Sequence, residues 1–256
     1  MDSLQTRENE SLNLEETLEF KFRSALKENP IMTDEGFIND MVLLSTEFYS
    51  RFSGVKLDEY LERLKTLKLE YFGKYAYPEY AVKYLPSTNV LAVNKEKITK
   101  QDIDCKHALM KAIIAIASTK GNNYGFGSFG DLEALNEGFI DLTARSLVGD
   151  EGKSGFNQER EIVDFIGKRI GVNPFTNAFF TNKPQILLNA MNDKCQNLEK
   201  LQAVLGQINH NMHTKKEDSY LIHVDIEREL ISMFGKVNQE VMKQTLSYTE
   251  GNTKTR

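Results

Sequence analysis

Tryptophan is absent from this 256-residue chain, and cysteine and proline are scarce, with two and five residues. The cysteines, Cys105 and Cys195, are far apart and have no Cys-x-x-Cys spacing. This pattern argues against a disulfide framework and against a paired-cysteine zinc clamp. We therefore expect two inert thiols in a reducing compartment.

The chain also lacks an excess of positive charge and any long apolar run. It has 32 Lys and Arg against 37 Asp and Glu, a net charge of -5, and no long basic cluster. Such a surface has no electrostatic footprint for nucleic acid or an anionic membrane. No window approaches the roughly 18 apolar residues of a membrane span, and segment 1–10 lacks the apolar region of a secretory signal. We expect a cytoplasmic protein that binds neither nucleic acid nor membranes.

Most of the chain shows helical periodicity. Apolar residues recur at helical spacing from Leu14 to Ala25, from Phe37 to Phe52 and from Leu57 to Tyr71. Segment 1–12 is polar and expected to fray, whereas Thr33-Asp34-Glu35 has the composition of a helix start. Further helices are expected at about 131–148, 157–170, 174–192, 194–211 and 217–248.

One segment favours β structure. The tyrosine-rich stretch 75–85 and the apolar stretch 90–93 flank a Pro-Ser-Thr-Asn turn, which predicts two short strands. Thr99 and Asp102 then resemble a capping box for a helix whose run from Leu109 to Ala117 is apolar almost all round. That helix should be central. The predicted class is mainly α, α+β, with a small β-hairpin or sheet and a helical C-terminal half.

We expect three regions within one continuous globular unit. They are an N-terminal helical region at 1–74, a core with the strands at 75–150 and a C-terminal helical region at 151–256. No Pro- or Gly-rich linker clearly separates them, and the glycines between 149 and 155 mark the best candidate boundary.

Two segments of the chain point to a function. The first is His107-Ala108-Leu109-Met110-Lys111, and the second, after a glycine-rich loop, is Ala134-Leu135-Asn136-Glu137-Gly138-Phe139-Ile140-Asp141. A His-Glu-x-x-His zinc peptidase needs two imidazoles one helical turn apart, where both can hold one metal. The Glu after the first His takes a proton from the metal-bound water.

The second segment resembles the Asn-Glu-x-x-x-Asp motif of the gluzincins, the clan typified by thermolysin. Asn136, Glu137 and Asp141 occupy the matching positions, and residues 75–150 follow the expected order of hairpin, helix, loop and helix. The likeness is particularly to bacterial proteins with a Leu-Asn-Glu-Gly motif. It implies a zincin-like core, with Glu137 in the place of a zinc ligand and Asp141 in the place of a residue that orients an imidazole.

The first segment departs from that family pattern. Ala108 stands where the catalytic Glu is expected and cannot abstract a proton, and Lys111 stands where the second imidazole is expected. An ammonium has no lone pair and would repel a dication, so both exchanges weaken zinc binding and peptide hydrolysis. We therefore expect a catalytically inactive metallopeptidase-like protein without a cofactor, with a structural or protein- or peptide-recognition role.

Lys111 is expected to replace the metal by forming an ion pair with Glu137, while Asp141 accepts a hydrogen bond from His107. One alternative is an active zinc peptidase in which His107, Glu137 and a distant histidine bind the metal. Another is a helical interaction module, in which the resemblance of segment 131–148 is accidental and helix 217–248 mediates self-association. A Glu and an Asp one turn apart, such as Glu137 and Asp141, are also commonly a solvated helix face. The partner, substrate and oligomeric state are not specified by the sequence.

Other candidates are weaker. His210 and His213 lie near a helix end, where capping is favoured over metal binding. His223 lies among apolar residues and is expected to be packed or partly exposed. The loop 121–130 lacks the Gly-Lys-Ser/Thr ending of a phosphate-binding loop. Tyrosines between 71 and 84 are expected to pack on a core, although they could instead line a peptide groove.

Overall fold

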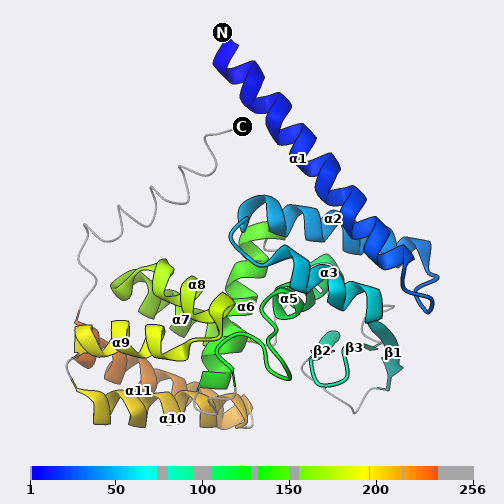
Figure 1. Ribbon diagram of the computed structural model, residues 1–256. Helices are drawn as coiled ribbons and strands as arrows, with labels where there is room; N and C mark the ends of the chain where they lie inside the picture. Colours follow the sequence, from blue (N-terminus) through cyan, green and yellow to red (C-terminus); the bar gives the residue numbers. More distant parts are fainter. Residues whose placement is uncertain are drawn as a thin grey trace. The chain divides into compact units, whose positions relative to one another are not determined.

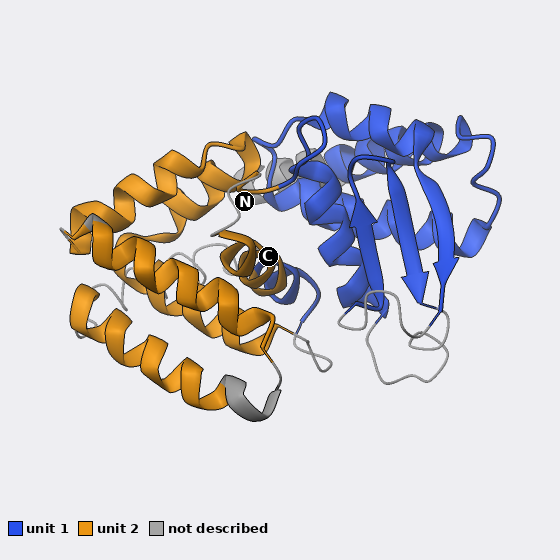
Figure 2. Cartoon of the chain, turned by 90° about the horizontal axis from the view of Figure 1, so that it is seen from below, with its two compact units in different colours: residues 1–124, 143–155 blue, residues 125–142, 156–256 orange. Residues whose placement is uncertain are grey.

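The computed structural model describes residues 2–73, 80–94, 105–127, 132–149, 156–195, 197–214 and 216–235. These residues form a mainly helical protein with a small mixed sheet (Figure 1). The chain divides into two compact units (Figure 2). Unit 1 comprises residues 1–124 and 143–155, and unit 2 comprises residues 125–142 and 156–256. The predicted regional boundaries remain a prediction. None of the described helices is long and apolar enough to cross a bilayer.

Unit 1 begins with three helices. They are α1 (Asp2–Lys27), α2 (Glu35–Arg51) and α3 (Leu57–Thr66), and α1 packs against both of the others. The predicted start of α2 is confirmed, because the Asp34 side chain accepts a hydrogen bond from the Phe37 backbone N–H at 3.1 Å. Helix α1 extends to Asp2 instead of starting near Leu14, in a segment rich in good helix formers.

Three strands follow, in the order β1-β3-β2 across the sheet. The predicted hairpin is confirmed as β2 (Val82–Leu85) and β3 (Val90–Asn94), which pair antiparallel. Strand β1 (Lys68–Phe72) pairs parallel with β3, so the prediction that a helix continues to Tyr71 was wrong. The predicted strand residues before Tyr80 lie outside the described residues.

Two asparagine side chains explain why the chain changes from helix to strand after α3. The Asn29 amide donates to the Leu64 and Leu67 carbonyls at 3.0 and 2.7 Å, and the Asn89 amide donates to the Arg63 carbonyl at 2.9 Å. These bonds satisfy carbonyls that the end of a helix leaves without partners. The chain is then held in register with β3, where the Lys68 N–H donates to the Asn89 carbonyl.

Helix α5 (Cys105–Ala117) is the central helix of unit 1, as predicted. It contacts α2, α3 and β2, and its apolar run is buried almost all round. The predicted capping box at Thr99 and Asp102 lies outside the described residues. After α5, the chain reaches α6 (Glu133–Val148), whose first part belongs to unit 2 and whose last turn and a half belongs to unit 1.

The described secondary-structure elements of unit 2 are all helices. It contains α7 (Asn157–Ile170), α8 (Val172–Thr181), α9 (Pro184–Cys195), α10 (Leu198–Met212) and α11 (Lys216–Phe234). The rings of Phe126, Phe139, Phe175 and Phe179 meet in its core. The prediction of one helix over 174–192 was wrong, because Asn182 adopts a left-handed conformation that ends α8 before Pro184 starts α9. The part of helix 217–248 beyond residue 235 lies outside the described residues.

Candidate functional site

Helix α5 carries the first candidate segment. His107 and Lys111 are both half-buried and, being four residues apart, lie on one face of the helix, while Ala108 is buried. The Lys111 ammonium is 5.9 Å from the centroid of the Tyr80 ring, which directly precedes the hairpin. At that distance the ring quadrupole attracts a cation. Unit 1 therefore holds the Lys111 side chain one helical turn from His107 and near the face of an aromatic ring.

Helix α6 carries the second segment, and its polar residues are buried. Asn136, Glu137 and Asp141 are 8%, 3% and 0% exposed. Glu137 and Asp141 lie one turn apart on the same face of the helix. A solvated acidic helix face is the ordinary explanation of such a pair, and their burial excludes it. A carboxylate this far from water requires charged or hydrogen-bonding neighbours.

Asn136 holds the start of the glycine-rich loop against α6. Its side-chain oxygen accepts a hydrogen bond from the Phe126 N–H at 3.0 Å, and the Asn182 amide donates to the neighbouring Gly125 carbonyl. Gly125 has a φ of 62°, and a Cβ there would lie 1.9 Å from the Asn136 oxygen. The first motif residue is thus a loop anchor that requires glycine opposite it.

Gly138 permits a close approach between α6 and α7. A Cβ at this position would lie 2.4 Å from the Glu159 carbonyl oxygen, which belongs to the first turn of α7. The approach brings Arg160 to Asp141, with 3.6 Å between the guanidinium Nη1 and the carboxylate Oδ2. The Arg160 side chain is 21% exposed. This ion pair is shielded from water, so screening by solvent is weak.

Sequence reasoning did not identify Arg160. Its position in an amphipathic helix next to Glu159 and Glu161 resembles an ordinary solvated face, and nothing local distinguishes it. The predicted partner of Asp141, His107, belongs to unit 1, whereas Asp141 and Arg160 belong to unit 2. The predicted His107–Asp141 hydrogen bond and Lys111–Glu137 ion pair therefore join residues of different units, and both remain predictions.

The other histidines lie on the last two described helices or at their ends. His210 is in the last turn of α10 and His213 is its C-cap, the positions predicted for them. The His213 Nε2 is 3.4 Å from a carboxylate oxygen of Glu133, and both side chains are more than half exposed. His223 of α11 is 6% exposed and faces Glu161 and Glu227. The packing predicted for His223 is confirmed, but its carboxylate neighbours were not predicted.

Comparison of the chain with protein-family models, with curated proteins and with solved structures finds no match. The function is therefore inferred from the residues themselves and their surroundings.

Proposed function

We propose that this protein is a degenerate gluzincin-like protein that binds an extended protein or peptide segment without hydrolysing it. The observation that carries the proposal is the burial of Glu137 and Asp141 on one face of α6. Buried carboxylates at this spacing are a feature of a metallopeptidase second motif and are unusual on an arbitrary helix. The order of the described elements, with a hairpin, the central helix α5, a glycine-rich loop and α6, supports the same resemblance.

The loss of catalysis follows from two side chains. Ala108 has no group that could take a proton from water, and the Lys111 ammonium cannot ligate a cation. Positive charge is instead supplied by the protein, by Arg160 beside Asp141 and by Lys111 near Tyr80. We propose that these internal cations take the electrostatic role that zinc has in an active gluzincin.

The recognition role is supported by β2. It lies at one edge of the sheet formed by the described strands, runs antiparallel to β3 and packs against α5. A strand at a sheet edge can pair with an extended peptide through main-chain hydrogen bonds. Such a peptide along β2 would lie beside the helix that carries His107 and Lys111, where Ala108 leaves no base to cleave it.

Restoring the lost residues one at a time tests the proposal. Lys111→His returns the missing imidazole one turn from His107, and the variant is expected to bind one zinc equivalent more than the native chain. Lys106→His, which adds a histidine at an exposed position of the same helix, is the matched control and should bind no additional zinc. Adding Ala108→Glu to Lys111→His should then allow slow peptide hydrolysis.

Three results decide between the functions. If Lys111→His gains no zinc although its circular dichroism shows a folded chain, the gluzincin assignment is wrong and a helical interaction module is favoured. If adding Glu137→Gln to Lys111→His does not remove the gained zinc, Glu137 does not bind the metal as the motif requires. If the native chain itself hydrolyses a peptide, the inactive-enzyme proposal fails and the active peptidase is favoured.

A further inference from the structure

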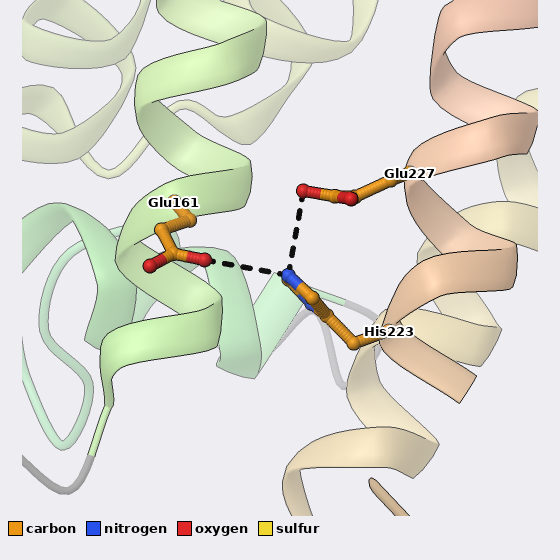
Figure 3. A group of neighbouring side chains, drawn as sticks. All are labelled: Glu161, His223 and Glu227. Atoms are coloured by element: carbon orange, nitrogen blue, oxygen red, sulfur yellow. Dashed lines mark ion pairs between the residues drawn. The ribbon is translucent and has the colours of Figure 1, made fainter. Parts of the chain in front are cut away.

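A second polar cluster lies in unit 2, away from the residues of the gluzincin-like motifs in sequence. Glu161 projects from α7, and His223 and Glu227 project from α11, one helical turn apart (Figure 3). The His223 Nε2 is 3.4 Å from a Glu161 carboxylate oxygen and 3.6 Å from a Glu227 carboxylate oxygen. One oxygen from each glutamate and one imidazole nitrogen lie within 4.8 Å of one another.

The imidazole is buried, whereas the carboxylates reach water. The His223 side chain is 8% exposed, and the Glu161 and Glu227 side chains are 56% and 50% exposed. Among the described residues, neither ring nitrogen of His223 has a hydrogen-bond partner. A buried polar atom without a hydrogen bond lowers the stability of the fold. The position of the His223 Nε2 facing two carboxylates therefore requires an explanation.

The distances separate two explanations. A charge-assisted N–H···O hydrogen bond is about 2.7–2.9 Å long, and both contacts exceed that range. In a tetrahedral site with metal–ligand bonds of about 2.0–2.2 Å, neighbouring ligand atoms are about 3.3–3.6 Å apart. The two distances measured from Nε2 match the edges of such a tetrahedron.

We propose that Glu161, His223 and Glu227 bind a divalent transition-metal ion, and that zinc is the ion this ligand set fits best. One imidazole and two carboxylates are ligands that zinc accepts, and the half-exposed glutamates leave room for solvent to complete the coordination. The two carboxylate charges balance the dication. The bound ion joins α7 to α11, two helices of one unit that otherwise make few contacts.

The competing explanation is an ion triad with a protonated His223. An imidazolium carries a proton on each nitrogen, and at the observed distances neither proton has a hydrogen-bond acceptor among the described residues. When a metal ion is bound to Nε2, only the Nδ1 proton is left without a hydrogen-bond acceptor among the described residues. Metal binding therefore satisfies one more buried polar atom than protonation does.

Zinc titration of the full chain tests this site. The protein is first dialysed against a chelator, and zinc uptake is then measured by calorimetry and by metal analysis. The native chain is expected to take up one equivalent, and its melting temperature should rise with the zinc concentration. Glu161→Gln and Glu227→Gln should each weaken that binding about tenfold or more, since each removes a ligand.

The variants have a matched control on the same helix. Glu229→Gln removes the same charge from α11, at a residue that pairs with Lys200 at 2.8 Å and not with His223, and it should bind zinc like the native chain. Because Glu161 and Glu227 are half-exposed, glutamine in their place opens no cavity. Cobalt provides a second measurement, since visible absorption bands that disappear in His223→Gln would report the imidazole as a ligand.

Two results would overturn the site. If the folded native chain takes up no zinc equivalent, the cluster is an ion triad only. If Glu161→Gln and Glu227→Gln bind zinc as tightly as the native chain, the metal lies elsewhere. The site is independent of the gluzincin-like motifs, so Glu137→Gln should leave this zinc equivalent unchanged, and failure of one proposal does not imply failure of the other.

Discussion

Two sets of carboxylates in unit 2 have opposite surroundings. Asp141 is fully buried and has the guanidinium of Arg160 beside it, whereas Glu161 and Glu227 are half-exposed around a buried imidazole. The first set is closed and is neutralised by the protein's own cation. The second is open to water and has an imidazole ring that faces two carboxylates. Similar residue types thus favour an internal ion pair in one place and an external cation in the other.

The two sites differ because the fold buries a carboxylate in the first and an imidazole in the second. A buried carboxylate needs a permanent cation close by, and arginine remains charged under all physiological conditions. A buried histidine that faces exposed carboxylates can use a ring-nitrogen lone pair to bind a metal. Mutations that remove these charges or disturb their packing test this contrast.

Removal of Asp141 should have the largest effect. Asp141→Ala leaves Arg160 shielded from water without its carboxylate, and we expect a loss of about 3–5 kcal/mol in the free energy of unfolding. Asp164→Asn is the control, because the Asp164–Lys168 pair, at 2.5 Å on the same helix as Arg160, is partly exposed to water, and its loss should cost less than about 1 kcal/mol. Urea denaturation measures both. Equal losses in the two variants would mean that burial does not distinguish the pairs.

Lys111→Met should have the next largest effect. It removes the cation that we expect opposite Glu137 while keeping the length of the side chain, and we expect a loss of about 3 kcal/mol. This is the lower end of the range for a buried pair, because Lys111 is half-buried. Denaturant unfolding of Lys111→Met and of Lys106→Met, at the exposed neighbouring position, gives the measurement. A loss below about 0.5 kcal/mol in the first variant would contradict the pair.

Gly138→Ala tests the close approach that brings Arg160 to Asp141. The added methyl group would meet the Glu159 carbonyl, and we expect a loss of about 1–3 kcal/mol from overpacking. Gly167→Ala is the control, since a Cβ there meets no heavy atom within 4 Å and alanine favours the helix by about 1 kcal/mol. The melting temperature should therefore fall in Gly138→Ala and rise in Gly167→Ala. A melting temperature that rises in both variants would show that α6 and α7 can separate at little cost.

Glu161→Gln should have the smallest effect on the metal-free protein. The exposed carboxylate contributes little to folding by itself, and the free energy of unfolding should change by less than about 0.5 kcal/mol in chelator. In zinc, the same variant should lose the rise in melting temperature that the native chain shows. A large loss of stability in chelator would show that the cluster is a structural ion triad. It would then stabilise the fold through its own charges, as the Asp141–Arg160 pair does.

Several elements were predictable because their signals are local. Asp34 caps α2, the turn at residues 86–89 joins β2 to β3, and the limits of α7 agree with the predicted 157–170. Capping, turn composition and helical periodicity each depend on residues a few positions apart. The same local evidence placed Glu137 and Asp141 on one helical face.

Other features could not be predicted from neighbouring residues. Strand β1 forms because β3 offers a pairing edge and because Asn29 and Asn89 satisfy the carbonyls at the end of α3. The neighbours of His223 belong in part to a different helix, and the burial of Asp141 depends on α7. Each of these depends on partners that are distant in sequence.

The amino-acid sequence alone was enough to predict the helical character of the protein, the hairpin, and the shared helical face of Glu137 and Asp141. These are properties of residue identity and short-range spacing, which are present before the chain folds. Tertiary structure decided which charged groups lose contact with water. Burial sets the energy of a charge, so it separates the enclosed Asp141–Arg160 pair from the open Glu161–His223–Glu227 cluster.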